Sequence, residues 1–566
     1  MTMLIYTFQF LEKRMNKLNI DPITSEIIQS SLQAACDEMF VAMRKTAMSS
    51  IIYEVLDFGT AVTDSKGNIA ASGAGIPAFI AMCDKAVQAV IKKYDDSEIK
   101  EGDVFATNDP YNGGVTHLND VIVVMPVFSG DEKIAWTANI AHWPDLGGMA
   151  PGGISADAKE IFQEGLQLPV IKMISEGKPI QSVIDIITAN SRVPQYTLGD
   201  MWAAIASIRV GEKRIKDIAS KYGKDTFKQS VQLFMDYGEN ASLDALSKLP
   251  HGKFHGEDLL DDGRKIQVDV TINEKEFIVD LRNNPAQDEG PNNASYDGTV
   301  VSAQMAFKGI TSSDFVCNAG TFRPLKVICD EGSMFNPVRP AAQGIYYETD
   351  IRSYDLIWKT ISHLNPDKSS AGSFASICGT FMGGQHPDTG ATFIIIEPQV
   401  GGWGASSVSD GCNANFSAFH GDTFNTPAEI SEARHGVYVD QMRLTDEDGG
   451  EGKFRGGKGI VMDYRVRSKN AWVSVAYTRS KSLPWPLDGG NEGGSNYIEI
   501  IRKNGKKEKY SVVTGLSLEP NDVVRIHTGN GGGCGNPKER DRNLIKEDLL
   551  NEYITKEQAQ KFYNFK

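Results

Sequence analysis

Apolar residues recur at two different spacings along this chain, and the first spacing is helical. Asp21 followed by Pro22 is typical of a helix start, and the three- and four-residue spacing of apolar residues after it predicts a helix to about Thr46. The same spacing predicts further helices over about residues 78–93, 182–187, 198–246, 300–317 and 541–562.

Short apolar runs, several of them alternating with polar residues, predict strands in the stretches between these helices. Residues 57–71 read as a hairpin, and residues 121–128 and 134–140 read as a second hairpin that turns at Gly130. Further strands are predicted over 103–107 and within 265–283 and 437–528. The pattern predicts an α+β fold of mixed and antiparallel sheets, with a strand-rich C-terminal part.

The chain has 566 residues, which is more than one hydrophobic core usually organises, so several domains are expected. The composition shifts near Pro250, and glycine, of which the chain has 55, is dense in the stretch that follows. We expect an N-terminal extension over 1–20, an α/β domain over 21–250, a glycine-rich α+β domain over 251–436 and a β-rich domain with a terminal helix over 437–566.

Charge and cysteine content narrow the class of protein. The net charge of −15, with no basic block, argues against nucleic acid as a partner, and no apolar run is long enough for a membrane span. Seven scattered cysteines without a C-x-x-C pair are typical of the reducing cytoplasm. The apolar stretch at 3–11 lacks the flanks of a signal peptide, so we expect a partner-docking segment or an extension translated ahead of the true start.

Two copies of a His-x-x-Asp pair flank the second predicted hairpin. His117 and Asp120 precede its first strand, and His142 and Asp145 follow its second strand. Because the two strands run antiparallel, both pairs are expected to converge at one end of the hairpin. One such pair alone is more often a surface hydrogen bond, but two imidazoles and two carboxylates together suit a divalent ion such as Zn or Mn. The predicted metal site belongs to the expected domain over 21–250.

A weaker candidate cluster lies near His420 and Asp422, shortly after the glycine-rich stretch 401–404. Polar loops of this kind can line a substrate cleft, which makes both residues candidates for substrate binding. The same composition also fits a network of structural turns, and the residues alone do not separate the two interpretations.

Two glycine-rich segments resemble nucleotide-binding loops and fail on inspection. Residues 452–458 match G-x-x-x-x-G-K, but Gly459 stands where a Ser or Thr would hold magnesium, and no helix is predicted to follow. Residues 529–535 lose the G-x-G-x-x-G register at Cys534. We therefore expect no nucleotide site within the chain itself.

With these residues assembled, the chain resembles the hydantoinase B/oxoprolinase family over nearly its whole length. The blocks that carry the resemblance are DFGTAVTD at 57–64, GDVFATNDPYNGGVTHLNDV at 102–121, ANIAHWPDLGGMAPGG at 138–153, AKEIFQEG at 158–165, GGEGKFRGGKG at 449–459 and GGGCGNPKERD at 531–541. Relatives commonly carry Tyr-Gly-Asp where this chain has Cys534-Gly535-Asn536, and they lack the extra N-terminal residues.

The resemblance implies a divalent metal centre, with one ion or two. Matched residue by residue, its ligands would be Asp57, His117, Asp120, His142 and Asp145. Asp57 is a candidate only through the resemblance. Asp120 is our candidate for a carboxylate that bridges two ions, because it lies between the two histidines in the sequence.

Glu160 is a further candidate that stands in one of the matching blocks. It would act as a general base or would support the ligands from outside. An acidic residue near a helix start is more often a cap, and that alternative stays open.

The resemblance also implies a function in a complex. It predicts the metal-binding subunit of an ATP-dependent amidase that opens hydantoins, N-methylhydantoin, 5-oxoproline or lactams, with ATP bound by a hydantoinase A-type partner in a hetero-oligomer. Two alternatives remain: a subunit of an ATP-dependent ketone carboxylase of the acetone or acetophenone type, and a non-catalytic subunit that only stabilises its partner.

Overall fold

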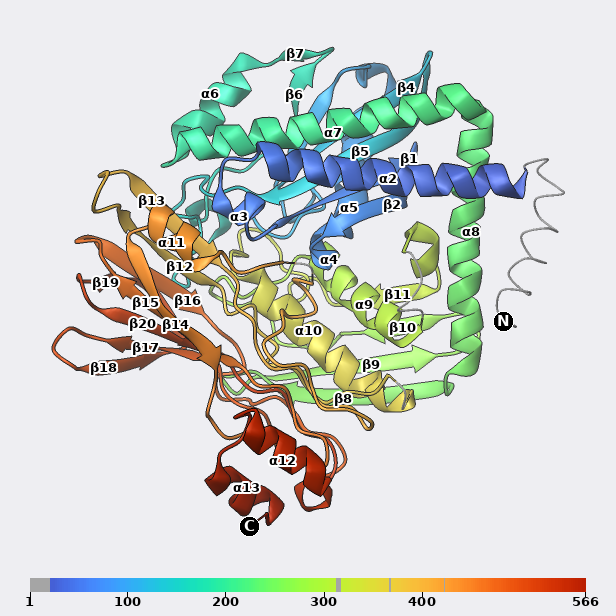
Figure 1. Ribbon diagram of the computed structural model, residues 1–566. Coiled ribbons are helices and arrows are strands. Elements are labelled where there is room, and N and C mark those ends of the chain that lie inside the picture. The colour runs from blue at the N-terminus through green and yellow to red at the C-terminus, as the bar shows by residue number, and fades with distance from the viewer. Residues whose placement is uncertain (1–20, 312–316, 366–367, 422, 566) are drawn as a thin grey trace.

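The computed structural model describes residues 21–311, 317–365, 368–421 and 423–565 (Figure 1). The predicted extension over 1–20 lies outside them, as does Asp422. Within the described ranges, no helix combines the length and the apolar character that a membrane span requires.

The N-terminal part is built on a seven-stranded sheet in the order β2-β1-β5-β4-β3-β6-β7. Neighbouring strands in it run antiparallel, including the two predicted hairpins. The strands are β1 (Phe58–Asp64), β2 (Ile69–Gly75), β3 (Val104–Thr107), β4 (Asp120–Ser129), β5 (Glu132–His142), β6 (Ile171–Ser175) and β7 (Lys178–Pro179).

Two long helices lie side by side over one face of this sheet (Figure 1). They are α2 (Pro22–Thr46) and α7 (Pro194–Tyr222), and the Thr137 hydroxyl of β5 donates to the Ile208 carbonyl of α7 at 3.1 Å. The next residue back, Trp136, points to the opposite face, where it lies near Phe105. The shorter helices of this part are α3 (Ser50–Tyr53), α4 (Pro77–Ile80), α5 (Cys83–Lys93) and α6 (Gln181–Asn190), with 3₁₀ turns η1 (Asp96–Glu98) and η2 (Ile161–Gln163).

Helix α8 (Lys224–Lys248) connects the first sheet to the middle of the chain (Figure 1). The long helical stretch predicted over 198–246 is two helices that meet at Gly223, whose φ of 86° a residue with a side chain rarely adopts. This glycine lets the chain turn sharply between α7 and α8.

The middle of the chain contains a four-stranded sheet in the order β11-β10-β9-β8, against which α10 packs. Strands β10 and β11 are parallel and the other pairs antiparallel, so the sheet is mixed as predicted. Its elements are β8 (Gly252–Leu259), β9 (Lys265–Ile272), β10 (Phe277–Asp280), α9 (Tyr296–Thr311), η3 (Ala319–Phe322), β11 (Leu325–Ile328), α10 (Tyr346–Ile361) and η4 (Ser362–Leu364).

The C-terminal part is strand-rich, as the sequence predicts, and contains two sheets that share one hydrophobic core. One has the order β13-β12-β16-β19 and the other β14-β15-β20-β17-β18. The elements are β12 (Thr380–Gln385), β13 (Thr392–Glu397), α11 (Ala428–Arg434), β14 (Val437–Leu444), β15 (Ile460–Val466), β16 (Ala471–Ala476), β17 (Tyr497–Ile501), β18 (Lys507–Tyr510), β19 (Val512–Leu518), β20 (Val523–His527) and η5 (Pro537–Glu539).

Three more predicted helices differ from the observed ones. The helix expected over 78–93 is divided into α4 and α5, and the terminal helix is divided into α12 (Arg542–Leu550) and α13 (Lys556–Tyr563). The second division occurs where Thr555 begins a new helix with a capping box. The helix expected over 300–317 runs from 296 to 311, and 312–316 lie outside the described residues.

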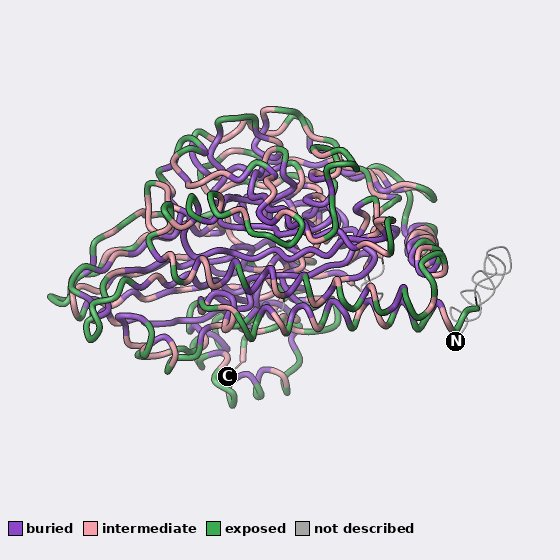
Figure 2. The backbone as a smooth tube through the Cα atoms, turned by 90° about the horizontal axis from the view of Figure 1, so that it is seen from above, coloured by how far each residue is buried: buried purple, intermediate pink, exposed green. Residues whose placement is uncertain are grey.

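The α+β fold class with mixed and antiparallel sheets is confirmed. Buried backbone gathers in the interior of the molecule and exposed backbone on the outer loops (Figure 2). The first hydrophobic core draws residues from the N-terminal sheet, from α10 and from β12 and β16, so these parts pack against one another. The exact domain boundaries stay a prediction.

Glu397, at the end of β13, is a buried carboxylate that makes stability depend on pH. Burial raises its pKa to about 7, against the hydrogen bonds donated by Asn425, Tyr464 and the Thr426 backbone. In the unfolded chain a glutamate titrates near about 4.3. Between these values the folded protein binds a proton that the unfolded chain has released. This group therefore lowers stability progressively as the pH rises from about 4.3 to 7.

A Glu397→Gln variant, which keeps the shape and cannot ionise, is expected to lose this part of the dependence. Its free energy of unfolding, measured by urea denaturation, should fall less than that of the wild type between pH 5 and 7. The difference should approach about 1.4 kcal/mol for each pH unit between the two pKa values. The exposed Glu289→Gln change is the control. Parallel curves for Glu397→Gln and wild type would contradict the prediction.

Candidate metal centre

The second hairpin brings three predicted ligands to one point. Asp120 is the first residue of β4 and pairs directly with His142, the last residue of β5. The Asp120 N–H donates to the His117 carbonyl at 3.1 Å, so the chain turns tightly just before β4 and returns the imidazole of His117 to the same place. The convergence predicted from the sequence is thus present for these three side chains.

The three side chains form a nearly equilateral triangle of ligand atoms. His117 Nε2 and His142 Nδ1 each lie 3.1 Å from Asp120 Oδ1, and the two nitrogens lie 3.3 Å apart. All three residues are buried, with exposed fractions of 2%, 0% and 4% for His117, Asp120 and His142. Among the described residues, these are the group whose His, Cys, Asp or Glu ligand atoms come close enough to hold one ion.

Neighbouring groups orient His117 and Asp120 toward the centre of the triangle. His117 Nδ1 lies 3.1 Å from the Gly344 carbonyl, to which it donates, and this leaves the lone pair on Nε2 for the centre. Tyr346 donates its hydroxyl to Asp120 Oδ2 at 3.0 Å, and Thr116 donates to the same oxygen. Only Oδ1 of Asp120 therefore faces the two imidazoles.

The cluster is electrostatically suited to a cation. Burial opposes ionisation of Asp120, but the two imidazoles outweigh it and hold the pKa of that carboxyl well below its usual range. Burial likewise lowers the pKa of His142, which favours its neutral form. Burial also acts against the charged form of His117, but the carboxylate of Asp120 raises its pKa overall. A buried carboxylate between imidazoles offers a cation a charged oxygen and nitrogen lone pairs.

Asp57 lies beside the triangle. Strand β1 pairs with β5 so that Phe58 is opposite Ala141, and the His142 N–H donates to the Asp57 carbonyl at 3.1 Å. The Asp57 side chain is buried, and its Oδ1 has no hydrogen-bond partner among the described residues. Burial and the charge of Asp120 raise its pKa well above the usual range.

His420 reaches the same centre from a distant part of the chain. Burial lowers the pKa of His420 to about 4, and the charges that it feels most are those of Asp120 and His142. Its Nδ1 is buried without a partner in the described part of the protein, as is Nε2 of His142. The predicted substrate residue thus lies near enough to the cluster to feel its charges, whereas Asp422 lies outside the described residues.

The structure does not bring Asp145 to the cluster. Its carboxylate accepts hydrogen bonds from the backbone of Gly147, Gly152 and Arg192 at 2.9 to 3.0 Å, and it forms an ion pair with the Arg192 guanidinium at 2.9 Å. Asp145 follows the end of β5, where the chain enters a loop, so the strand pairing that holds Asp120 in place does not extend to it. The Asp145 carboxylate therefore stabilises that loop through these hydrogen bonds.

Glu160 does not contact the three side chains of the triangle in any hydrogen bond of the described structure. The neighbouring acid Glu164, and not Glu160, supports the loop behind His117. Glu160 is exposed at the start of η2, the cap position that remained its alternative interpretation. Glu164 is buried, and it accepts hydrogen bonds from the backbone N–H groups of Gln343 at 3.0 Å and Gly344 at 2.6 Å. It thereby holds the loop whose carbonyl orients His117. Both acids stand in one sequence block, and spacing alone could not distinguish them.

The distances in the triangle fit one divalent ion. Ligand atoms held at about 2.1 Å around a tetrahedral ion lie about 3.4 Å apart, and the observed separations are 3.1 to 3.3 Å. The unpartnered buried atoms of Asp57, His142 and His420 would also find a partner if an ion and its water occupied the centre. The donor set suits Zn and Mn alike.

Tyr346, which the sequence did not single out, provides a test of the ligand geometry. The Tyr346→Phe variant is expected to weaken metal binding by about tenfold, because Asp120 loses a hydrogen bond that fixes its orientation. The measurement is a titration of the metal-free protein in competition with a chelator. Tyr347→Phe is the matched control, since that neighbouring buried hydroxyl has no partner in the described structure. Equal affinities in both variants would refute this role of Tyr346.

The chain is similar to known proteins in sequence and in fold. The family model described as hydantoinase B/oxoprolinase matches residues 21–537 of the chain. The caprolactamase subunit beta of Pseudomonas jessenii is 27% identical, covering 95% of this chain and 94% of its own length.

Two solved structures share the fold. The crystal structure of the ATP-dependent caprolactamase from Pseudomonas jessenii matches with a TM-score of 0.89 at 24% identity, covering 96% of each chain. The nucleotide-free structure of acetone carboxylase matches with a TM-score of 0.87 at 16% identity, covering 96% of this chain and 79% of that one. At these identities the structural likeness concerns the fold alone.

Proposed function

The chain belongs to the hydantoinase B/oxoprolinase family, and from this premise we propose that it is the metal-binding catalytic subunit of an ATP-dependent enzyme that opens cyclic amides. The observation that carries the proposal is the buried triangle of His117, Asp120 and His142. A similar protein is named as a caprolactamase subunit, and a similar structure is that of an ATP-dependent enzyme, which supports a partner and a nucleotide requirement.

The proposed ligands are His117, Asp120 and His142, with Asp57 as a fourth. Asp57 is included because its buried Oδ1 has no partner and because it lies within reach of the charge of Asp120. Since Oδ2 of Asp120 is bonded to two hydroxyls, only one of its oxygens is open, and we propose a single ion in the triangle. A divalent ion there would polarise a carbonyl and lower the pKa of water toward about 7.

The chain's own residues have three tasks in this mechanism. Asp120 stays ionised at neutral pH and keeps the centre attractive to a cation. His420 stays neutral, because burial lowers its pKa to about 4, and its open Nδ1 can hydrogen-bond the substrate or receive a proton from the attacking water. Glu164 acts through the loop of Gly344 as a positioning residue for His117.

ATP has a defined place in this chemistry. Resonance makes a cyclic amide resistant to water, and transfer of the γ-phosphoryl group of ATP to the amide oxygen makes the ring carbon more electrophilic. Water adds to that carbon, and the ring C–N bond breaks as the nitrogen takes up a proton. The acyl phosphate that remains is hydrolysed by a second water to a carboxylate and phosphate. Neither glycine-rich segment forms the strand–loop–helix of a phosphate loop: residues 452–458 lie between β14 and β15, and 529–535 follow β20 and lead into η5. We therefore assign ATP to a hydantoinase A-type partner subunit.

The test is reconstitution with such a partner. The complex is expected to open hydantoin, 5-oxoproline or caprolactam and to release ADP in proportion, and the isolated chain should contain a divalent metal by elemental analysis. Bicarbonate-dependent consumption of a ketone would assign the chain to the carboxylases instead. A metal-free chain in a complex that opens none of the three rings would defeat the proposal.

A further inference from the structure

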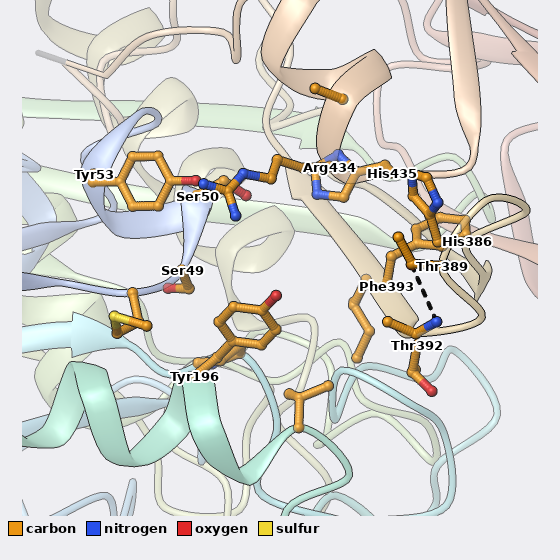
Figure 3. Close-up of a pocket in the computed structure, with 16 residues that line it drawn as sticks. Ser49, Ser50, Tyr53, Tyr196, His386, Thr389, Thr392, Phe393, Arg434 and His435 are labelled. Atoms are coloured by element: carbon orange, nitrogen blue, oxygen red, sulfur yellow. Dashed lines mark hydrogen bonds between the residues drawn. The ribbon is translucent and has the colours of Figure 1, made fainter.

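A polar cavity that none of the three triangle residues lines lies between the parts of the molecule that hold α3 and α11 (Figure 3). Its volume is about 290 Å³, near the lower end for ligand sites, so its occupant is small. Helix α3 and the start of α7 form one wall, and the β12–β13 turn and the end of α11 form the other.

The lining of this cavity is positive and rich in hydroxyls. No Asp or Glu is among the residues that line it, although the chain as a whole carries a net charge of −15. The lining has one arginine, Arg434, and two histidines, His386 and His435. Its hydroxyl-bearing residues are Ser49, Ser50, Tyr53, Tyr196, Thr389 and Thr392. Asp200, an acid behind the wall, accepts hydrogen bonds from the backbone N–H groups of Met48 and Ser49.

His386 presents a buried hydrogen-bond donor that has no acceptor. The Asp388 N–H donates to its Nδ1 at 3.2 Å, so in the neutral ring the proton is on Nε2. The residue is only 7% exposed, and Nε2 is buried without a partner in the described structure. A buried N–H of this kind is costly to leave unpaired, which indicates a missing acceptor.

His435 adds a second unpartnered ring nitrogen on the same side of the cavity. It is 5% exposed, it lies against the ring of Phe393, and its Nδ1 is buried with no partner among the described residues. Figure 3 shows the two imidazoles on one side of the cavity and the Arg434 side chain extending from α11 toward Tyr53. The Tyr196 hydroxyl points into the space enclosed by these side chains. Donors therefore surround the cavity from several directions.

A cation does not suit this place, because Arg434 contributes a permanent charge of the same sign and no carboxylate offsets it. A carboxylate ligand has two oxygens, whereas the guanidinium, the two imidazoles and the hydroxyls supply more donors than two oxygens need. A phosphate group has three or four oxygens and pairs well with an arginine fork.

We propose that this cavity is a binding site for a phosphate group, held by Arg434, His386 and His435. The site stands on its own residues and does not depend on the metal chemistry proposed above. It would accept either free inorganic phosphate or the phosphoryl end of a small organic phosphate, since both offer the same oxygens.

Calorimetric titration of the full-length, metal-free protein tests the proposal. Removing the metal excludes phosphate bound to an ion at the triangle. Inorganic phosphate is expected to bind with a dissociation constant below about 1 mM, and Arg434→Ala and His386→Asn are each expected to weaken it by about tenfold or more. Arg434 is exposed at the end of α11, so its loss should leave the fold intact.

Arg443→Ala, an exposed arginine paired with Asp446 outside the cavity, is the matched control and should bind phosphate as the wild type does. A second titration with phenyl phosphate separates the sources: tighter binding than inorganic phosphate identifies an organic phosphate, and weaker binding identifies the free ion. Failure of the wild type to bind either compound, unchanged binding in Arg434→Ala, or equal affinity for acetate would each overturn the site. The titration does not involve ring opening, so its failure is distinct from a failure of the proposed amidase function.

Discussion

The His142→Ala variant is expected to lose the bound metal ion and to lower ATP-coupled ring opening by more than about a hundredfold. His142 supplies one of the three atoms in the triangle, and its backbone is fixed at the end of β5 by pairing with Asp120. Replacing the side chain therefore removes a ligand while the strand that carries it stays in register. His117→Ala should have the same effect, since His117 completes the triangle from the preceding turn.

The measurements are the metal content of the purified variants and the turnover of the reconstituted complex, with near-ultraviolet circular dichroism to verify folding. His255→Ala is the matched control, because that exposed histidine is paired with Asp269 and Glu257 on β8 and β9, away from the centre. Full activity in both His117→Ala and His142→Ala, with folding intact, would end the case for a metal mechanism.

The largest effect on stability is expected for Arg479→Ala, at about 3–5 kcal/mol. Arg479 is fully buried after β16, and one end of its guanidinium bonds both Asp258 of β8, at 2.7 Å, and Asp355 of α10. Loss of the arginine leaves Asp355 without its ion pair in a buried position, and Asp258 keeps only Arg352 and Lys359. An uncompensated buried charge is far more costly than a lost surface pair.

Urea denaturation followed by circular dichroism measures this effect as a shift of the first unfolding transition. Arg465→Ala is the control. Arg465 donates to Asp440 through Nε and Nη2, but the pair is about one third exposed and should contribute about 1 kcal/mol or less. Comparable shifts in the two variants would show that burial of the Arg479 network does not matter to stability.

The local part of the candidate site follows from the sequence. The alternation over 121–128 and 134–140 and the turn at Gly130 predict the hairpin, and the hairpin alone brings Asp120 to His142. Their meeting needs only the pairing of two strands that are adjacent in the chain, and the glycine turn sets its register. The same reasoning predicted Asp145 near the centre, whereas the structure has its carboxylate bonded to its own loop and to Arg192, because a residue beyond the strand end is positioned by its loop contacts.

Other parts of the site depend on contacts between distant segments. Asp57 reaches the centre through the pairing of β1 with β5, which the sequence did not predict, so it became a candidate only through the family resemblance. Tyr346 and Glu164 reach it through the segment that begins α10, more than 170 residues after Glu164 in the chain. No spacing rule connects residues so far apart.

What the sequence by itself determined is most of the pattern of helices and strands, the α+β class, the family and the meeting of the three proposed ligands at the end of one hairpin. These follow from short-range periodicity and from residues that local strand pairing holds together. Only the tertiary structure decided which acid supports the loop behind His117 and which hydroxyls bind Asp120. It also decided that His420 lies near the cluster and that the Asp145 carboxylate binds its own loop. Those choices depend on how separate elements pack, because burial and hydrogen-bond partners are properties of the assembled core and not of any one segment.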